Sequence, residues 1–233
     1  MDRRTFINDM SKLGMAAMAM GSAGAVAQEN SSNNTGVSGS AGAAAQENAT
    51  NAASASGPAE GEAWSSPFGG VSTFDEPKFE FIFEIDLDFT RVQNIANMPT
   101  GAGRGAVYLD AGKVSGPHLN GHATPDSGGD WALFRPDDVL AFDARYMLEE
   151  DDGTLILLRN NGYLWGRFPD TIAKIQDWIF NNGPVVPEDE YYLRAFPTFE
   201  VEKGKHDWLM RYVIVGVGRR KEAGNIVRYY ALL

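Results

Sequence analysis

The sequence predicts an all-β domain, either a closed antiparallel barrel or a sandwich, with about eight or nine strands and one short helix. Three observations support this prediction. Apolar and acidic residues alternate over residues 78–89, which is the period of a strand with one buried face. Residues 112–162 consist of short alternating runs separated by Gly, Pro and an Asp-Gly pair, as is typical of hairpins. A helical pattern appears near residues 170–181.

The strands can be placed in order along the chain. The first, KFEFIFEIDLDF at 78–89, alternates between two faces. One face is predicted to carry Phe79, Phe81, Phe83, Ile85, Leu87 and Phe89, and the other Glu80, Glu84, Asp86 and Asp88. A loop containing Gly and Pro follows at 95–104. Further strands are predicted at 105–110, 114–124, 131–135, 139–148, 154–160, 191–201, 208–217 and 225–233. Asp152-Gly153 is expected to form a tight hairpin turn.

One amphipathic helix interrupts this pattern. Its apolar residues recur at helical spacing: Ile172, Ile175, Trp178 and Ile179. Asp170 is suited to begin the helix as its N-cap, and Gly183 is suited to end it. We expect the helix to lie over one end or side of the barrel.

The composition excludes several classes of protein. A net charge of -11 disfavours nucleic acid and anionic membrane surfaces as partners. The absence of cysteine removes disulfides, thiol nucleophiles and cysteine-based metal sites. The chain has no uninterrupted apolar run of about 18 residues, so no membrane-spanning helix is expected.

The N-terminal residues resemble an export signal rather than part of the fold. Arg3-Arg4 precede Phe6-Ile7 as in a twin-arginine motif, and a mildly apolar segment ends at the small-x-small site Ala25-Val26-Ala27. The alternative is a basic, disordered N-terminus. The repeat SAGAVAQEN/SAGAAAQEN offers a second cleavage point, after Ala45. We expect export to the periplasm.

Three regions follow from these patterns. Residues 1–27 form the predicted signal peptide. Residues 28–70 are mostly Ser, Asn, Ala and Gly, and cannot bury enough apolar surface to offset the entropy of ordering, so they form a predicted disordered linker. Residues 71–233 form the predicted β-domain.

An ordered set of motifs in this domain resembles the family called domain of unknown function 3237. The motifs are Gly112, Gly116-Pro117, Gly121, Gly128-Gly129-Asp130-Trp131, Asp143-Ala144-Arg145-Tyr146, Asp151-Asp152-Gly153, Asn160-Asn161-Gly162, Tyr191-Tyr192-Leu193-Arg194 and Asp207-Trp208-Leu209. The resemblance covers residues 78–233 and implies a closed antiparallel β-barrel of calycin-like, lipocalin-like shape that self-associates. The export signal, the helix-bearing segment 168–187, and His118 and His122 depart from the family's pattern.

Asp130 and Arg145 are the candidate catalytic residues. Asp130 precedes Trp131, and a carboxylate against an apolar wall can act as a general base with a raised pKa. As a turn residue it would only accept backbone N–H groups. Arg145 shares a strand face with Asp143 and, if it points inward, could hold a substrate carboxylate or oxyanion. Otherwise it forms a structural ion pair with Asp143 or across strands.

Six residues are predicted to line a ligand pocket. They are Arg104, Trp131, Tyr146, Tyr192, Arg194 and Trp208. Tyr192, Arg194 and Phe196 fall on one strand face, which suits an aromatic pocket with one cationic anchor. That face could equally pack against the helix or a partner, and large aromatic residues in a barrel are more often core than ligand contacts.

No metal or cofactor is predicted. His118 and His122 would lie about 13 Å apart on a strand, which is too far for one metal. His206 and the acidic runs at 149–152 and 188–190 are expected in solvated turns. The Gly-rich run 101–105 lacks a phosphate-loop ending.

The sequence therefore predicts an exported barrel that binds a small aromatic or carbonyl compound. It could be a cofactor-independent lyase, isomerase or cyclase, in which Asp130 moves a proton while Arg145 and Arg194 hold the oxyanion. The alternatives are a lipocalin-like binder without chemistry and a structural assembly module; a homo-oligomer fits the family. Convergence of these three side chains on one cavity would favour the enzyme.

Overall fold

The computed structural model describes residues 67–68 and 77–233. The predicted signal peptide and nearly all of the predicted linker lie outside the described residues. Phe68, within the predicted linker range, is buried in the barrel core. Among the described residues, no helix is long and apolar enough to cross a membrane.

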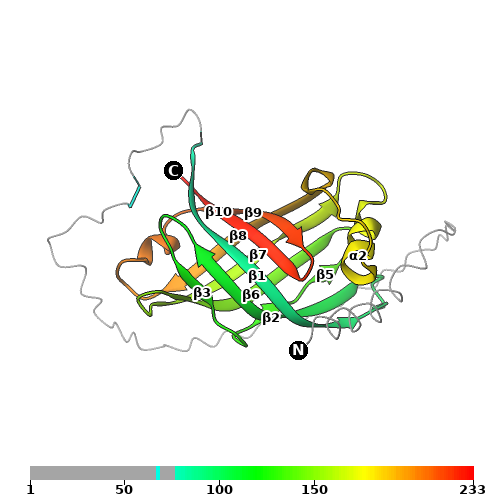
Figure 1. The fold of residues 1–233 in the computed structure, drawn as a ribbon, viewed down its shortest axis with the longest axis horizontal. Coiled ribbons are helices and arrows are strands. Elements are labelled where there is room, and N and C mark those ends of the chain that lie inside the picture. Colours follow the sequence, from blue (N-terminus) through cyan, green and yellow to red (C-terminus); the bar gives the residue numbers. More distant parts are fainter. Residues whose placement is uncertain (1–66, 69–76) are drawn as a thin grey trace, which may run out of the picture. The chain divides into compact units, whose positions relative to one another are not determined.

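The strands form one antiparallel sheet that closes on itself, because β1 pairs with both β10 and β2 (Figure 1). The strands are β1 (Phe79–Ile95), β2 (Gly103–Ser115), β3 (Gly121–Ala123), β4 (Gly129–Asp130), β5 (Leu133–Phe134), β6 (Leu140–Glu150), β7 (Leu155–Gly166), β8 (Tyr191–Val201), β9 (Ile214–Lys221) and β10 (Gly224–Leu232). The short strands β3, β4 and β5 together occupy the place of one strand between β2 and β6. With the seven full strands β1, β2 and β6–β10 they complete an eight-stranded barrel, which confirms the predicted closed antiparallel fold.

From Phe83 onward, the alternation in β1 separates the core from the outer surface. Before it, an irregularity in the register between Phe81 and Phe83 breaks the alternation. Phe79 is 54% exposed, so the expectation that it shares the core face is wrong. Phe83, Ile85 and Leu87 point inward and are buried. The intervening acidic residues face outward, where Glu84 pairs with Arg228 at 2.7 Å and Asp86 and Asp88 both pair with Lys221. The acidic face is therefore a solvated, ion-paired outer surface.

Two apolar clusters fill the barrel from its two ends. The larger contains Phe83, Leu148 and Tyr229 and extends beneath η2 (Asp207–Met210). The smaller contains Leu164 and Tyr191 and packs beneath α2 (Thr171–Asn181). Figure 1 shows α2 in yellow at one end of the barrel and the η2 segment in orange at the other. A further 3-10 turn, η1 (Glu188–Glu190), precedes β8.

The predicted helix is confirmed, with a different N-terminal contact. Ile175 and Trp178 are buried against the barrel. The Asp170 side chain makes no cap hydrogen bond; its backbone carbonyl accepts the Lys174 N–H instead. The helix ends at Asn181, the following C-cap residue Asn182 adopts left-handed backbone angles, and the Gly183 N–H donates to the Asp177 carbonyl. The Asp152-Gly153 turn is also confirmed, with Gly153 at φ +88°.

Three strand predictions are wrong in part. Residues 114–124 are not one strand: the Asn120 side-chain amide donates to the Gly116 carbonyl at 2.9 Å and closes a loop between β2 and β3. The predicted strand 208–217 begins instead with the 3-10 turn η2. The consecutive residues Trp208 and Leu209 are both buried there, whereas regular strand alternation would place them on opposite faces. Of the third, 131–135, only Leu133–Phe134 forms a strand, β5, and the separate strand β4 precedes it at Gly129–Asp130.

The first strand is longer than predicted. It continues to Ile95 rather than ending at Phe89. Irregular register between Asp88 and Arg91 marks bulges, which bend the strand and let it continue around the barrel beside β2.

Candidate functional site

Asp130 is an acidic residue whose side chain lies inside the apolar barrel. It ends β4 and pairs with Val107 of β2 and Ala144 of β6, both on the inward side. Its Oδ1 atom accepts the Asp143 N–H at 2.9 Å, so the carboxylate occupies a place that a strand carbonyl would otherwise take. Asp130 is therefore fixed by backbone on both sides and points away from bulk solvent.

The two glycines before Asp130 allow β4 to lie close to β2 and β6. A Cβ atom on Gly128 would lie 1.8 Å from the Arg145 carbonyl oxygen, and one on Gly129 would lie 2.4 Å from the Val107 carbonyl oxygen. No side chain fits either contact. The Gly-Gly pair before Asp130 therefore allows β4 to lie close between its neighbours.

We expect Gly129→Ala to destabilise the fold by about 1–3 kcal/mol, because the methyl group meets rigid backbone. Gly103→Ala is the matched control on β2: its nearest neighbour would be the Phe134 Cβ at 3.5 Å, an ordinary contact. Urea denaturation followed by circular dichroism measures both. Equal midpoints for the two variants would contradict the role assigned to Gly129.

The environment of Asp130 favours its protonated form. Burial raises the pKa of its carboxyl to about 7, and the nearby Asp143 charge adds to the rise. The Asp143 N–H, Arg220 and Arg104 oppose it. The side chain is enclosed but keeps some accessible surface. A carboxyl group that titrates near neutral pH in an apolar enclosure is suited to accept and return a proton.

Arg220 supplies the enclosed positive charge. It lies on β9, two residues beyond the inward-facing Gly218, and its Nη1 donates to Asn225 Oδ1 at 2.8 Å. Its backbone N–H donates to the Tyr191 hydroxyl at 2.9 Å. Burial lowers the pKa of Arg220 to about 10, and the charges of Tyr191 and Asp130 counteract this. The guanidinium remains cationic at neutral pH, and its Nε–H has no hydrogen-bond partner in the part of the chain that the structure describes.

Two phenols and one amide extend the enclosed polar group. Burial raises the pKa values of Tyr146 and Tyr229 above the usual range, so both are neutral hydrogen-bond donors. Their hydroxyls interact with each other, but neither makes a hydrogen bond of good geometry. Asn160 Oδ1 is also buried without a partner. Unsatisfied buried polar atoms are rare in proteins, and several in one interior indicate a place that takes up water or a ligand.

Arg145 does not join this interior group. It lies on the outward side of β6 with 53% of its side chain exposed, and pairs with Asp143 at 3.3 Å. Arg159 also contacts Asp143, at 3.2 Å. Although partial burial opposes it, hydrogen bonds from these arginines lower the pKa of Asp143. The expectation that Asp130 and Arg145 share an interior is therefore wrong, because neighbouring strands place them on opposite faces of the sheet.

Arg104 and Trp131 lie at the outer surface near Asp130. Arg104 Nη1 donates to the Trp131 carbonyl at 3.1 Å. Trp131 is 43% exposed and lines a shallow depression with Asp143 and Arg145. Trp131 thus forms no interior wall, whereas Tyr146 does.

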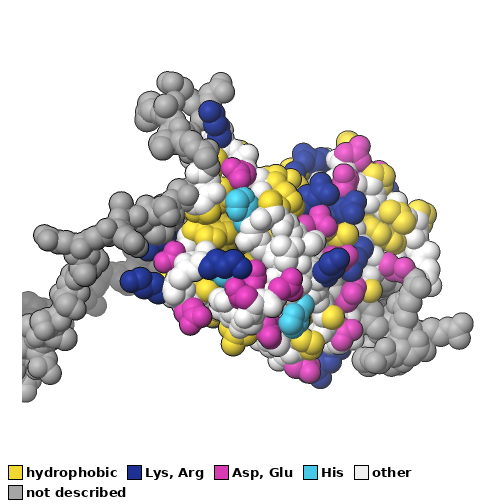
Figure 2. Space-filling model, turned by 60° about the vertical axis from the view of Figure 1, so that its left-hand side comes forward, with side chains coloured by type: hydrophobic (Ala, Val, Ile, Leu, Met, Phe, Trp, Pro, Cys, Tyr) yellow, Lys and Arg dark blue, Asp and Glu magenta, His cyan; other side chains and the backbone are white. Residues whose placement is uncertain are grey.

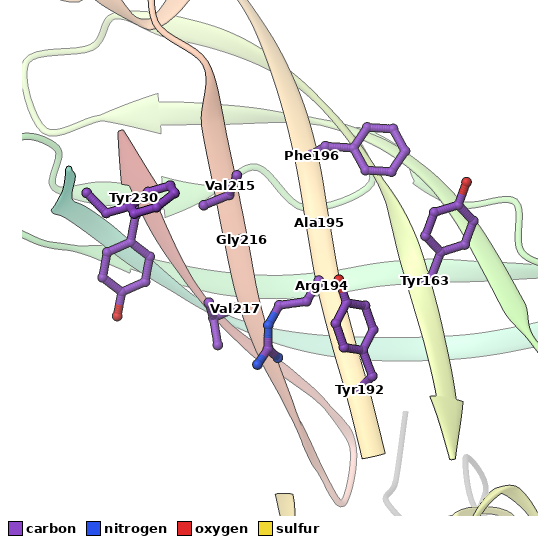
Figure 3. Close-up of a pocket in the computed structure, with 10 residues that line it drawn as sticks. Tyr163, Tyr192, Arg194, Ala195, Phe196, Val215, Gly216, Val217 and Tyr230 are labelled. Atoms are coloured by element: carbon purple, nitrogen blue, oxygen red, sulfur yellow. The ribbon is translucent and has the colours of Figure 1, made fainter. Parts of the chain in front are cut away.

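Tyr192 and Arg194 line a groove on the outside of the barrel, over β7 to β10. We call this the outer groove; its volume is about 600 Å³. Figure 3 shows Phe196 and Tyr163 on one side, Tyr230 on the other, and Arg194 beside Tyr192 between them. The Arg194 guanidinium lies 5.1 Å from the Tyr192 ring centroid. The predicted aromatic stripe with a cationic anchor exists, but on the face opposite to Asp130.

Trp208 is a core residue rather than part of either site. It is 4% exposed and meets the Phe68 ring edge-on at 5.3 Å and the His118 ring at 5.8 Å. Of the predicted site residues, only Asp130 and Tyr146 are therefore brought together in the barrel interior.

The sequence predictions missed Arg220, Tyr229 and Asn160. Arg220 is the middle of three consecutive basic residues, and only the strand register shows that it points inward. Tyr229 lies two residues after Val227 in β10, so strand alternation could have predicted that both point inward. Asn160 belongs to the Asn-Asn-Gly motif, whose alternation alone does not reveal which asparagine is buried.

A closed antiparallel β-barrel with enclosed polar groups is the class of protein that this fold and interior define. The chain belongs to the family described as "Protein of unknown function (DUF3237)", whose model matches residues 77–232. This confirms the resemblance drawn from the ordered motifs.

Relatives and solved structures agree with this assignment. A UPF0311 protein from Clostridium acetobutylicum is 28% identical over 162 residues, covering 70% of this chain and 98% of the relative. The crystal structure of a protein with unknown function from the same species matches with a TM-score of 0.60 and 28% identity, over 69% of this chain and all of that one. A "beta-barrel like protein" from Acinetobacter baumannii matches with a TM-score of 0.57 and 26% identity, over 68% and 97% of the two chains.

Proposed function

We propose that this protein binds a small aromatic or carbonyl compound inside its barrel, at Asp130 and Arg220, and that Asp130 moves a proton of the bound compound without a cofactor. The observation that carries the proposal is the enclosed group itself. A carboxyl, a guanidinium and two phenols lie within an apolar barrel, with several of their polar atoms lacking partners.

The chemistry of these groups fits proton transfer beside a carbonyl. At pH 7 about half of the Asp130 carboxyls would be ionised, because its pKa is about 7. Such a base can remove a proton next to a carbonyl or from a phenol. Arg220 and the Tyr146 and Tyr229 hydroxyls can stabilise the resulting oxyanion, since donors in a low-dielectric interior act strongly. Arg220 thus takes the role first assigned to Arg145 and Arg194.

Ligand binding can be tested by thermal shift with phenol, 4-hydroxybenzoate and phenylpyruvate. We expect at least one to raise the melting temperature of the wild type, and Arg220→Met to abolish that rise because the anchoring cation is gone. Arg159→Met is the control, since Arg159 is an exposed arginine on the outer face. A rise that survives Arg220→Met would contradict binding at the interior group.

Turnover of each hit separates an enzyme from a binder. The compound is incubated with wild type and with Asp130→Asn, and the mixture is analysed by chromatography and by loss of deuterium from the position beside the carbonyl. Product formation by the wild type alone supports proton transfer by Asp130, and so does deuterium loss from phenylpyruvate, the one probe of the three with hydrogens beside its carbonyl. Recovery of every hit unchanged would leave a lipocalin-like binder.

The outer groove supports a second candidate function, binding without chemistry. It offers aromatic rings and the Arg194 cation, and among the described residues no acidic or histidine side chain lines it. Arg194→Met discriminates the two sites. If this variant loses the ligand-induced shift while Arg220→Met keeps it, the outer groove is the binding site and the protein is not an Asp130 enzyme.

Export to the periplasm is a separate proposal that rests on the N-terminal residues. Replacing Arg3-Arg4 by Lys-Lys should retain the unprocessed chain in the cytoplasm, because the twin-arginine motif no longer directs it. Cell fractionation with an antibody to the β-domain measures this. Equal export of both forms would contradict the twin-arginine route.

A further inference from the structure

A second group of functional side chains lies at the η2 end of the barrel, away from Asp130. Glu150 ends β6, Asp152 lies in the β6–β7 turn, and His206 precedes η2. Figure 2 shows this end of the molecule, where acidic, basic and histidine side chains gather on the surface. His206 and the acidic run at 149–152 were predicted in solvated turns. That prediction is wrong for His206 and Glu150, which are both buried.

His206 is buried without a hydrogen-bond partner among the described residues. Its side chain is 1% exposed, and neither ring nitrogen makes a hydrogen bond. Nε2 faces two carboxylate oxygens, Glu150 Oε1 at 3.6 Å and Asp152 Oδ2 at 3.7 Å. These separations are too long for hydrogen bonds. An imidazole enclosed in this way lacks the partner that its burial requires.

Backbone hydrogen bonds hold the two carboxylates so that one oxygen of each faces His206. Glu150 Oε2 accepts the Asp152 N–H at 2.7 Å. Asp152 Oδ1 accepts the Thr154 N–H at 2.9 Å. The oxygens that face His206 are therefore the ones not used by the backbone, an arrangement that orients ligands around a metal.

The two separations from His206 to the carboxylates fit a tetrahedral metal. All three ligand atoms lie within 4.8 Å of one another. Bonds of about 2.1 Å from zinc to nitrogen and oxygen place neighbouring ligands of a tetrahedron about 3.4 Å apart, close to the two measured separations. Calcium fits less well, since it takes six to eight oxygens, whereas this cluster offers one oxygen from each of two carboxylates. A mixed imidazole and carboxylate set suits zinc.

The Lys205 ammonium occupies the position that a metal ion would take. Its Nζ lies 3.1 Å from Glu150 Oε1 and 3.2 Å from Asp152 Oδ2, the same two oxygens that face His206. The lysine side chain is 64% exposed, so it can swing into solvent with little loss of packing. Its ammonium marks where positive charge is stabilised.

We propose that Glu150, Asp152 and His206 form a zinc site, with Lys205 leaving when the ion binds and water completing the coordination. The ion would join the β6–β7 turn to the loop before η2. It would thereby raise the stability of this end of the barrel, because it binds only the folded arrangement. The site is independent of Asp130 and of the function proposed for it.

Zinc binding to the full chain tests the proposal, by titration calorimetry with ZnCl₂ and by the melting temperature with and without it. We expect one zinc per chain and a higher melting temperature, with at least tenfold weaker binding in both His206→Gln and Asp152→Asn. His122→Gln is the control, because His122 is an exposed histidine 3.9 Å from Glu149. Removal of the competing ammonium in Lys205→Met should tighten binding by about tenfold.

Each other outcome overturns the proposal. No saturable zinc binding by the wild type would do so, as would zinc binding that is unchanged in His206→Gln and Asp152→Asn. Weaker or unchanged binding in Lys205→Met would contradict the position assigned to the ion. If His206→Gln does not fold, Asp152→Asn decides the matter, since Asp152 lies in an exposed turn.

Discussion

Asp130→Asn is expected to make the protein more stable at pH 8, by up to about 4 kcal/mol. The pKa of the carboxyl is about 7 in the folded state against 3.8 for an unperturbed aspartate. The folded protein therefore binds this proton more tightly than the unfolded chain does. The stability that it contributes is fully present below about pH 4 and is lost as the pH rises through 7. The asparagine has no charge to desolvate, and its Oδ1 can still accept the Asp143 N–H.

The measurement is urea denaturation of wild type and Asp130→Asn between pH 4 and pH 9. The difference in unfolding free energy should grow with pH and level off above about pH 8, since other titrating groups cancel between the two proteins. Asp110→Asn, at an exposed position of β2, should give a small difference. A wild type that is the more stable protein at pH 8 would show that the Asp130 carboxylate is a structural acceptor, and would remove the proposed base.

Trp208→Ala is expected to cost about 3–5 kcal/mol of unfolding free energy, the usual loss for a large aromatic removed from a core. The side chain fills the space between Phe68, His118 and the end of the barrel. Nearby backbone is held by η2 and cannot collapse freely into the cavity. The melting temperature should fall accordingly.

Trp131→Ala is the matched control, because Trp131 is the same residue type at the outer surface. It should cost less than about 1 kcal/mol. Circular dichroism in urea follows both variants without relying on tryptophan fluorescence. Both tryptophans were predicted to line a ligand pocket, so similar losses for the two would argue against the placement of Trp208 in the core.

The local patterns determined the elements wherever one physical requirement dominated. The alternation of residues 83–89, the Asp152-Gly153 turn and the apolar face of 170–181 each depend on neighbours within a few residues, and each is found in the structure. The family resemblance selected the barrel over the sandwich. Strands were predicted wrongly where a side chain makes a hydrogen bond that a neighbouring strand's backbone would otherwise make. Asn120 and Asp130 are the two examples.

The composition of the interior could be predicted only in part. Asp130 and Tyr146 were named from the sequence, and both point into the barrel. Arg145 and Arg194 were named for the same site, but lie outside it. Strand alternation shows that residues two apart share a face, yet in this barrel both faces of β6 and β8 carry aromatic or charged residues, so alternation does not identify the inner face.

The sequence by itself therefore determined an all-β chain with one helix, a family, and an aspartate after two glycines that was worth testing. Only the tertiary structure decided which charges are enclosed. Closure of the barrel brings Arg220 of β9 toward Asp130 of β4, and the turn after β6 toward His206 after β8. These partners are 90 and 54 residues apart in the chain. The physical reason is that desolvation depends on which face of the closed sheet a residue occupies, and that is fixed by the register of distant strands.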